Sequence, residues 1–135
     1  MPLTRSRLNR ISQATREQTQ CWKEGVSLER DGGGSVDILL RRAAAARWRL
    51  AYSFRTQGNK LLAASSPQYR SAISRYYYSM YHAMRACVFL ANEGDDHEAH
   101  SVLPTKVPAT LDPLTDWSSK LKSARLLRNR ADYDT

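Results

Sequence analysis

Two groups of side chains in this sequence have the residue types and spacing to act on a phosphate. One is the segment RNRADY at positions 128–133, and the other comprises Arg75, Tyr78, His82 and Arg85. The second group falls at intervals of three, four and three residues, which places it on one helix face. Arginine binds phosphate in a planar fork, and histidine can move a proton near neutral pH. Because neither group contains an obvious nucleophile, the pattern favours stabilisation of charge on a phosphate.

A plainer interpretation of these features stays open. The four-residue group is also typical of a polar helix flank whose tyrosine packs and whose histidine satisfies a backbone group. The net charge of +8 is concentrated in residues 36–94, which hold nine Lys or Arg and two Asp or Glu. Such a basic surface is typical of nucleic-acid binding and equally of a solvated helix.

Arg128 stands on what the spacing predicts to be a buried helix face. Residues at intervals of three and four form one stripe there: Leu114, Trp117, Leu121, Ala124, Arg128 and Ala131. A charged side chain on such a stripe needs a partner, because an unpaired buried charge is strongly unfavourable. We therefore expect Arg128 to face the core and to be paired.

Four helical segments are expected to position these groups, and no segment is typical of a strand. They cover residues 3–28, 36–64, 66–90 and 114–132, with Ser35 and Ser66 as N-caps of the second and third. The second has an apolar stripe of Val36, Leu39, Leu40, Ala43, Ala46, Leu50 and Phe54. The third has the cleanest stripe, formed by Tyr69, Ile73, Tyr76, Met80, Ala83, Cys87 and Leu90. The expected fold is an all-α antiparallel bundle of four to five helices.

The chain divides by composition into a short extension and one domain. Residues 1–35 are predicted to be an N-terminal helical extension that ends in a glycine-rich linker at 31–35, and residues 36–135 to be the bundle. The connection 95–113 is polar, contains prolines and is long, as functional loops often are. Two distant cysteines, the lack of an apolar leader and the lack of a membrane-length apolar run predict a soluble, cytoplasmic protein with reduced thiols.

The sequence does not predict a metal or a cofactor. His97 and His100 have the i, i+3 spacing that can hold a metal, and acidic residues lie nearby, but no third strong ligand stands at a defined spacing. The run Gly32-Gly33-Gly34 lacks the ending of a phosphate loop and the strand that would precede it.

Residues 72–86, AISRYYYSMYHAMRA, resemble the helix A-x-S-R-x-Y-Y-A-x-F-H-A-A-R-A of HEPN domains, the small α-helical domains named for higher eukaryotes and prokaryotes nucleotide-binding. The segment RNRADY at 128–133 resembles the R-N-x-A-D-Y ending of the same prokaryotic branch, in the expected order. His100-Ser101 matches the His-Ser pair that this branch often has in its loop. The resemblance covers residues 36–134.

The resemblance implies a four- or five-helix bundle, usually a homodimer, and in many members a metal-independent endoribonuclease. Such members act as toxins of toxin–antitoxin systems or as phage-defence effectors, often encoded beside a nucleotidyltransferase partner. Their R-x4–6-H motif lets the RNA 2′-hydroxyl attack and leaves a cyclic phosphate. By this resemblance Arg128 would stabilise the scissile phosphate and Asn129 would orient it. The remaining site residues are Tyr133 and His82 for proton transfer, and Arg75, Arg85, Tyr78 and Asp132 for RNA binding.

Tyr133 stands where the motif histidine is expected. A tyrosine with a pKa near 10 is a poor general base at pH 7. Three interpretations follow: His82 or another residue takes the proton, the chain binds RNA or a nucleotide without cutting, or Tyr133 accepts a nucleotidyl group from a partner. A structural bundle whose basic surface has no such role is a further alternative.

Overall fold

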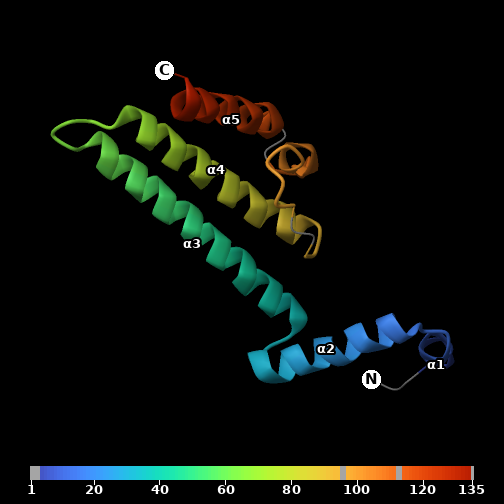
Figure 1. The fold of residues 1–135 in the computed structure, drawn as a ribbon. Helices are drawn as coiled ribbons and strands as arrows, with labels where there is room; N and C mark the ends of the chain where they lie inside the picture. Colours follow the sequence, from blue (N-terminus) through green and yellow to red (C-terminus); the bar gives the residue numbers. More distant parts are fainter. Residues whose placement is uncertain (1–3, 95–96, 112–113, 135) are drawn as a thin grey trace. The chain divides into compact units, whose positions relative to one another are not determined.

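The computed structural model describes residues 4–94, 97–111 and 114–134, and every regular element in those residues is a helix (Figure 1). The helices are α1 (Arg5–Ser12), α2 (Arg16–Gly32), α3 (Val36–Leu62), α4 (Tyr69–Ala91) and α5 (Trp117–Tyr133), with a short 3-10 helix η1 (Leu103–Lys106) before α5. The predicted all-α class is therefore confirmed. The chain separates into two compact units, residues 1–39 and 40–135. No helix in the described ranges combines the length and the apolar character that a membrane span requires.

The N-terminal unit has two helices where the sequence predicted one. Thr15 starts α2 with a capping box, in which its hydroxyl accepts from the Gln18 N–H and the Gln18 side chain accepts from the Thr15 N–H. Gly33, with φ of 65°, ends α2 in the left-handed conformation that favours glycine. The predicted linker is therefore mostly a helix cap, because only residues 33–35 separate α2 from α3.

Small residues bring α3 and α4 together. The two helices run antiparallel and side by side (Figure 1), and the buried residues of α3 are Ala44, Ala51 and Gly58, each seven apart. A repeat of seven keeps the same helix face toward a neighbouring helix. An added Cβ at Gly58 would lie 2.9 Å from Cε1 of Tyr76, so glycine is what allows this ring to lie against α3. The Tyr76 hydroxyl then donates to Asn59 Oδ1 at 2.6 Å.

A different face of α4 packs on α5. The larger core cluster contains Tyr77, Tyr81, Met84 and Val88 of α4 together with Leu103 of η1 and Leu121 of α5. α5 crosses α4 on the side away from α3 (Figure 1). Leu103 is fully buried, so η1 ties the connection between α4 and α5 to the core.

The large apolar residues of the predicted stripes are largely not the buried ones. Tyr69, Ile73 and Leu90 of α4 are exposed, and so is Leu50 of α3. The physical reason is that α4 contacts two helices at once: Tyr77, Tyr81 and Val88 face α5, while Ala86 and Phe89 pack on Ala44 of α3. A single stripe weighted by residue size misses the small-residue face.

The predicted start of α4 was also wrong. The helix begins at Tyr69 after Gln68, two residues later than the Ser66 cap implied. The Gln68 N–H donates to the Leu61 carbonyl at 3.0 Å, which holds this turn against the end of α3.

Candidate functional site

The predicted row Arg75, Tyr78, His82 and Arg85 forms what we call the polar flank, one of the two sides of α4 that lie between α3 and α5. Phe54 of α3 fills this side, with its ring centroid 5.5 Å from that of Tyr78 and 5.3 Å from that of His82. The Phe54 and His82 rings are parallel within 6°. The polar flank is therefore a packed layer of rings, and its imidazole is held in place by stacking.

A second imidazole reaches this layer from the connection between α4 and α5. The His100 ring stacks on Tyr81 with centroids 4.1 Å apart, and its Nδ1 is hydrogen-bonded to the Tyr77 hydroxyl. The Tyr81 hydroxyl donates to the Glu98 carbonyl two residues earlier in the same loop. Two tyrosine hydroxyls of α4 thus position the loop, and within the described residues Nε2 of His100 has no hydrogen-bond partner.

Arg128 enters the same layer from α5. Its guanidinium carbon lies 5.3 Å from the Tyr77 ring centroid and 5.7 Å from that of Tyr78. Nη1 pairs with Asp132 Oδ2 at 3.1 Å, and only 13% of the Arg128 side chain is exposed. The expectation that Arg128 faces inward and is paired is confirmed. Within the described residues its Nε is buried without a hydrogen-bond partner.

Asp132 links the two helices at this point. Its Oδ1 accepts from the Ser74 hydroxyl of α4, while Oδ2 pairs with Arg128. The hydrogen bonds from Ser74 and then from Arg128 lower the pKa of Asp132, although burial opposes them. The ionised carboxylate fixes the direction of the Arg128 guanidinium.

We call the six side chains that meet here the histidine–arginine cluster: Tyr77, Tyr78, Tyr81, His82, His100 and Arg128. Burial, followed by the charge of Arg85, lowers the pKa of His82. Burial, followed by the charge of Arg128, lowers the pKa of His100. Both imidazoles are therefore neutral at pH 7 and able to accept a proton. Burial also raises the pKa of Tyr77, so its phenol keeps its proton.

Two further arginines border the cluster. The Arg85 guanidinium lies over the Tyr81 ring at 5.5 Å and pairs with Glu98 at 3.4 Å. Arg75 is exposed and lies 5.7 Å from the Phe54 ring centroid. These positions leave positive charge at both ends of the polar flank.

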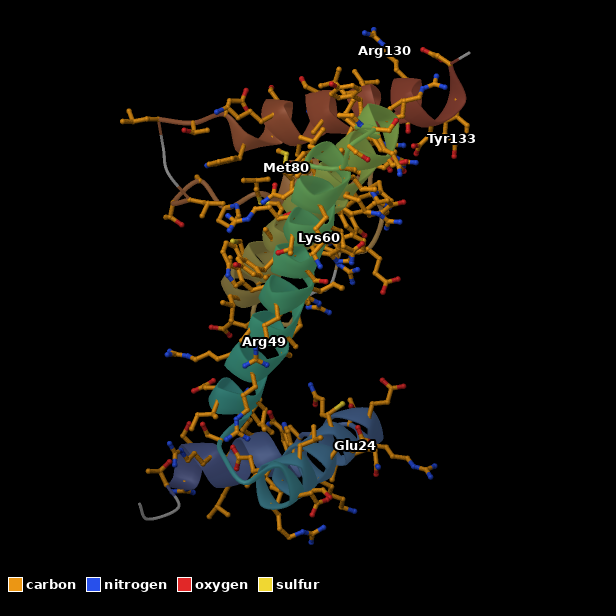
Figure 2. The ribbon with its side chains drawn as sticks, turned by 90° about the vertical axis from the view of Figure 1, so that its left-hand side faces the viewer. Glu24, Arg49, Lys60, Met80, Arg130 and Tyr133 are labelled. Carbon is orange, nitrogen blue, oxygen red and sulfur yellow. The ribbon has the colours of Figure 1, made fainter. Side chains whose placement is uncertain are left out.

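Two predicted site residues lie apart from the cluster. Tyr133 is 75% exposed near the end of α5 (Figure 2) and lines a surface hollow that Arg70, Arg75 and Asp132 also line. Among the described residues neither a ring contact nor a hydrogen bond joins it to the cluster. Asn129 is half-buried on α5, and its side chain makes no hydrogen bond with the described residues. The other six predicted residues therefore lie in the cluster or at its border, with Asp132 joined through Arg128. Tyr133 and Asn129 lie outside the cluster.

Sequence reasoning missed four side chains that build the cluster or position it. They are Phe54, Tyr77, Tyr81 and His100. The i, i+4 spacing of Tyr77 and Tyr81 could have indicated a second aromatic face of α4. His100 was noted for its His-Ser resemblance and as half of a metal pair. That pair is separated in the structure, since His97 contacts Asn92 while His100 contacts Tyr77.

The described residues contain no group of three His, Cys, Asp or Glu side chains placed to hold a metal ion. No protein-family model matches this chain, and comparisons with curated proteins and with solved structures gave no match either.

Proposed function

We propose that this protein is a HEPN-type RNA-directed effector, a metal-independent endoribonuclease that acts at the histidine–arginine cluster. The observation that carries the proposal is the meeting of two neutral imidazoles with an inward-facing arginine on one side of α4. Its biological setting would be a toxin–antitoxin or phage-defence system in the cytoplasm. A homodimer and a nucleotidyltransferase partner belong to the same proposal, and both rest on the sequence resemblance.

In this proposal the RNA supplies its own nucleophile. Arg128 would bind the scissile phosphate through the part of its guanidinium that stays exposed, since 13% of the side chain is accessible. With Nδ1–H of His100 donating to the Tyr77 hydroxyl oxygen, the unprotonated Nε2 takes the proton of the adjacent 2′-hydroxyl, whose oxygen attacks phosphorus. The bond to the 5′-oxygen breaks, the 5′-oxygen receives a proton from the imidazolium, and a 2′,3′-cyclic phosphate remains. Arg75 and Arg85 would hold the neighbouring phosphates.

The positions of the candidate bases favour His100 and His82 over Tyr133. A phenol is a weak base at pH 7, and within the described residues no hydrogen bond or ring contact joins Tyr133 to the cluster. His100 is fixed by Tyr77 and Tyr81, and its lowered pKa keeps it unprotonated at neutral pH. Of the interpretations open at the sequence level, proton transfer by a histidine is therefore the best supported.

The test is cleavage of end-labelled single-stranded RNA in the presence of EDTA. We expect the wild-type chain to cut and Arg128→Ala to cut about 100- to 1000-fold more slowly, the size of effect seen when one oxyanion donor is removed. Arg130→Ala is the matched control: Arg130 is exposed and points away from α4 (Figure 2), so its loss removes the same charge from the same helix without touching the cluster. The control should cut within twofold of wild type.

A second candidate is a non-catalytic HEPN module that binds RNA, a nucleotide or a nucleotidyltransferase. The exposure of Tyr133 beside Arg70 favours it, because a partner enzyme or a nucleotide phosphate could reach that phenol. RNA binding that falls steeply with salt but never leads to cutting would support the module over the enzyme. Cutting that stops with EDTA, or that survives Arg128→Ala, would contradict the proposed mechanism.

A further inference from the structure

Two large aromatic side chains of α3 face solvent in line with two arginines. Trp48 is 57% exposed and Tyr52 is 59% exposed. Arg41 and Arg55, which are also exposed, continue the line on either side. Because these four residues follow one another at intervals of seven, four and three, they share one helix face. We call them the α3 row.

The α3 row is separate from the histidine–arginine cluster. Arg41, Trp48 and Arg55 each stand three positions before one of the buried small residues of α3, which is about 60° around the helix from the face that contacts α4. Phe54, which packs in the polar flank, lies on the other side of that contact face. The indole of Trp48 is supported from one side, since it lines a hollow together with Met80 and Cys87 of α4.

The row offers rings and cations next to each other. Trp48 and Tyr52 are about one helical turn apart, or about 6 Å along the axis. The Arg55 guanidinium carbon lies 4.9 Å from the Tyr52 ring centroid. Exposed aromatic side chains bordered by basic ones are the usual means by which proteins hold single-stranded nucleic acid, because bases stack on the rings while cations pair with phosphates.

The charge around the row favours a polyanion over a protein surface of mixed charge. Residues 38–92, which cover nearly all of α3 and the whole of α4, hold nine Lys or Arg and no Asp or Glu. Arg49 and Lys60 add exposed positive charge on α3 next to the row. A nucleic-acid strand brings one negative charge with each base, so it matches both the rings and the charge.

We propose that the α3 row is a binding platform for single-stranded RNA, distinct from the site of cutting. Bases stack on Trp48 and Tyr52, while phosphates pair with Arg41 and Arg55. A duplex fits poorly, because its bases already stack on one another. The choice of RNA over DNA rests on the proposed function. The row contributes affinity and takes no part in proton transfer.

The test is the affinity for a fluorescein-labelled 2′-O-methyl RNA of about 12 nucleotides, measured by fluorescence anisotropy. This strand has no 2′-hydroxyl, so the proposed mechanism cannot cut it. Tyr52→Leu removes a ring that does not line the hollow, and its dissociation constant should rise about 5- to 150-fold, the range for one stacked base. Trp48→Leu should weaken binding in the same range, and it is the decisive variant if circular dichroism shows that Tyr52→Leu does not fold.

Two control variants bracket that loss. Tyr52→Phe keeps the ring and should bind like wild type. Trp22→Leu removes an exposed tryptophan from the N-terminal unit and should leave the dissociation constant unchanged.

Two further readouts separate stacking from charge. Linear polyphosphate carries the charge without bases, so its affinity should be the same in Tyr52→Leu and wild type. Arg55→Gln should reduce the slope of log affinity against log salt by about 0.7, the value for one phosphate of a single strand. Arg130→Gln, at an exposed position of α5, should leave that slope unchanged.

Three results would overturn the platform: an unchanged RNA affinity in Tyr52→Leu, an equal loss of polyphosphate and RNA binding, or a concentration-dependent dimer that disappears in Tyr52→Leu. The last would assign the row to an interface between two copies of the chain. The platform and the cutting site fail separately. If the chain cuts RNA, Tyr52→Leu should raise KM and leave kcat unchanged, whereas binding at the row without any cutting of ordinary RNA would contradict only the endoribonuclease.

Discussion

The two sides of α4 that lie between α3 and α5 are filled in opposite ways. The polar flank holds stacked rings, and the opposite side, which we call the apolar flank, is lined by Met80, Ala83 and Cys87. On the polar flank, the rings of Phe54, Tyr78 and His82 stack on one another. On the apolar flank, Ala83 and Cys87 leave a hollow of about 260 Å³. One helix therefore offers fixed donors and imidazoles on one side and free volume on the other. Changes on the polar flank should alter chemistry, and changes on the apolar flank should alter stability.

The largest expected effect is that of His100→Asn on the polar flank. Asparagine keeps a polar partner for the Tyr77 hydroxyl near the position of Nδ1 but has no counterpart of Nε2. Because proton transfer by a positioned side chain contributes about 100- to 10,000-fold, RNA cutting should fall by at least 100-fold. The free energy of unfolding should change by less than about 1 kcal/mol.

His97→Asn is the control for that variant, because His97 lies in the same loop and contacts Asn92 at the end of α4. Its cutting rate should match wild type. Equal losses in the two variants would mean that the loop as a whole matters and that the His100 imidazole has no special role.

A smaller effect, on stability and not on RNA cutting, is expected for Met80→Ala on the apolar flank. Met80 is half-buried and lines the cavity, so its truncation enlarges the hollow. Truncation of a fully buried Met to Ala lowers the free energy of unfolding by about 2–5 kcal/mol. Because Met80 is partly exposed, we expect a loss of about 1–2 kcal/mol. Denaturant unfolding should show that loss while RNA cutting stays within twofold of wild type. A tenfold fall in cutting with unchanged stability would show that the two flanks are coupled through α4.

The smallest effect is a dependence of stability on pH that arises from the polar flank. Burial, together with neighbouring arginines, lowers the pKa of His82 and of His100 below the ordinary value of 6.5. Below pH 6.5 the unfolded chain therefore binds more protons than the folded one, so stability falls as pH falls through that range and is level above it. The cutting rate should rise with pH and reach half its maximum below pH 6.5, since the base must be neutral.

Melting temperatures recorded from pH 8 to pH 5 would check this slope. It should weaken in His82→Gln and in His100→Asn and persist in Met80→Ala. An unchanged slope in both histidine variants would place its origin outside the polar flank.

The sequence predicted the helices well because helix formation is local, and it predicted their buried faces poorly because those depend on neighbours. Ala44, Ala51 and Gly58 form the contact face of α3, yet a pattern search weighted by side-chain size selects Leu50 and Phe54 instead. Their repeat of seven was present in the sequence and would have indicated the correct face.

The candidate site was predictable only where helix periodicity applies. Arg128 and the row on α4 could be placed from their spacing, and both lie where expected. His100 lies in a loop without periodicity, and its position depends on hydroxyls of Tyr77 and Tyr81 whose reach across the fold no spacing rule provides. Tyr133 follows Arg128 by five positions, which turns it away from the face that Arg128 occupies.

The order in which the cluster is assembled has a consequence for protein synthesis. Phe54 and the polar flank of α4 leave the ribosome first, His100 follows, and Arg128 with Asp132 comes last. A nascent chain can therefore pair α3 with α4 before Arg128, which would bind the scissile phosphate, has been made. If the chain cuts RNA, it would stay inert until α5 has been made and has docked on α4.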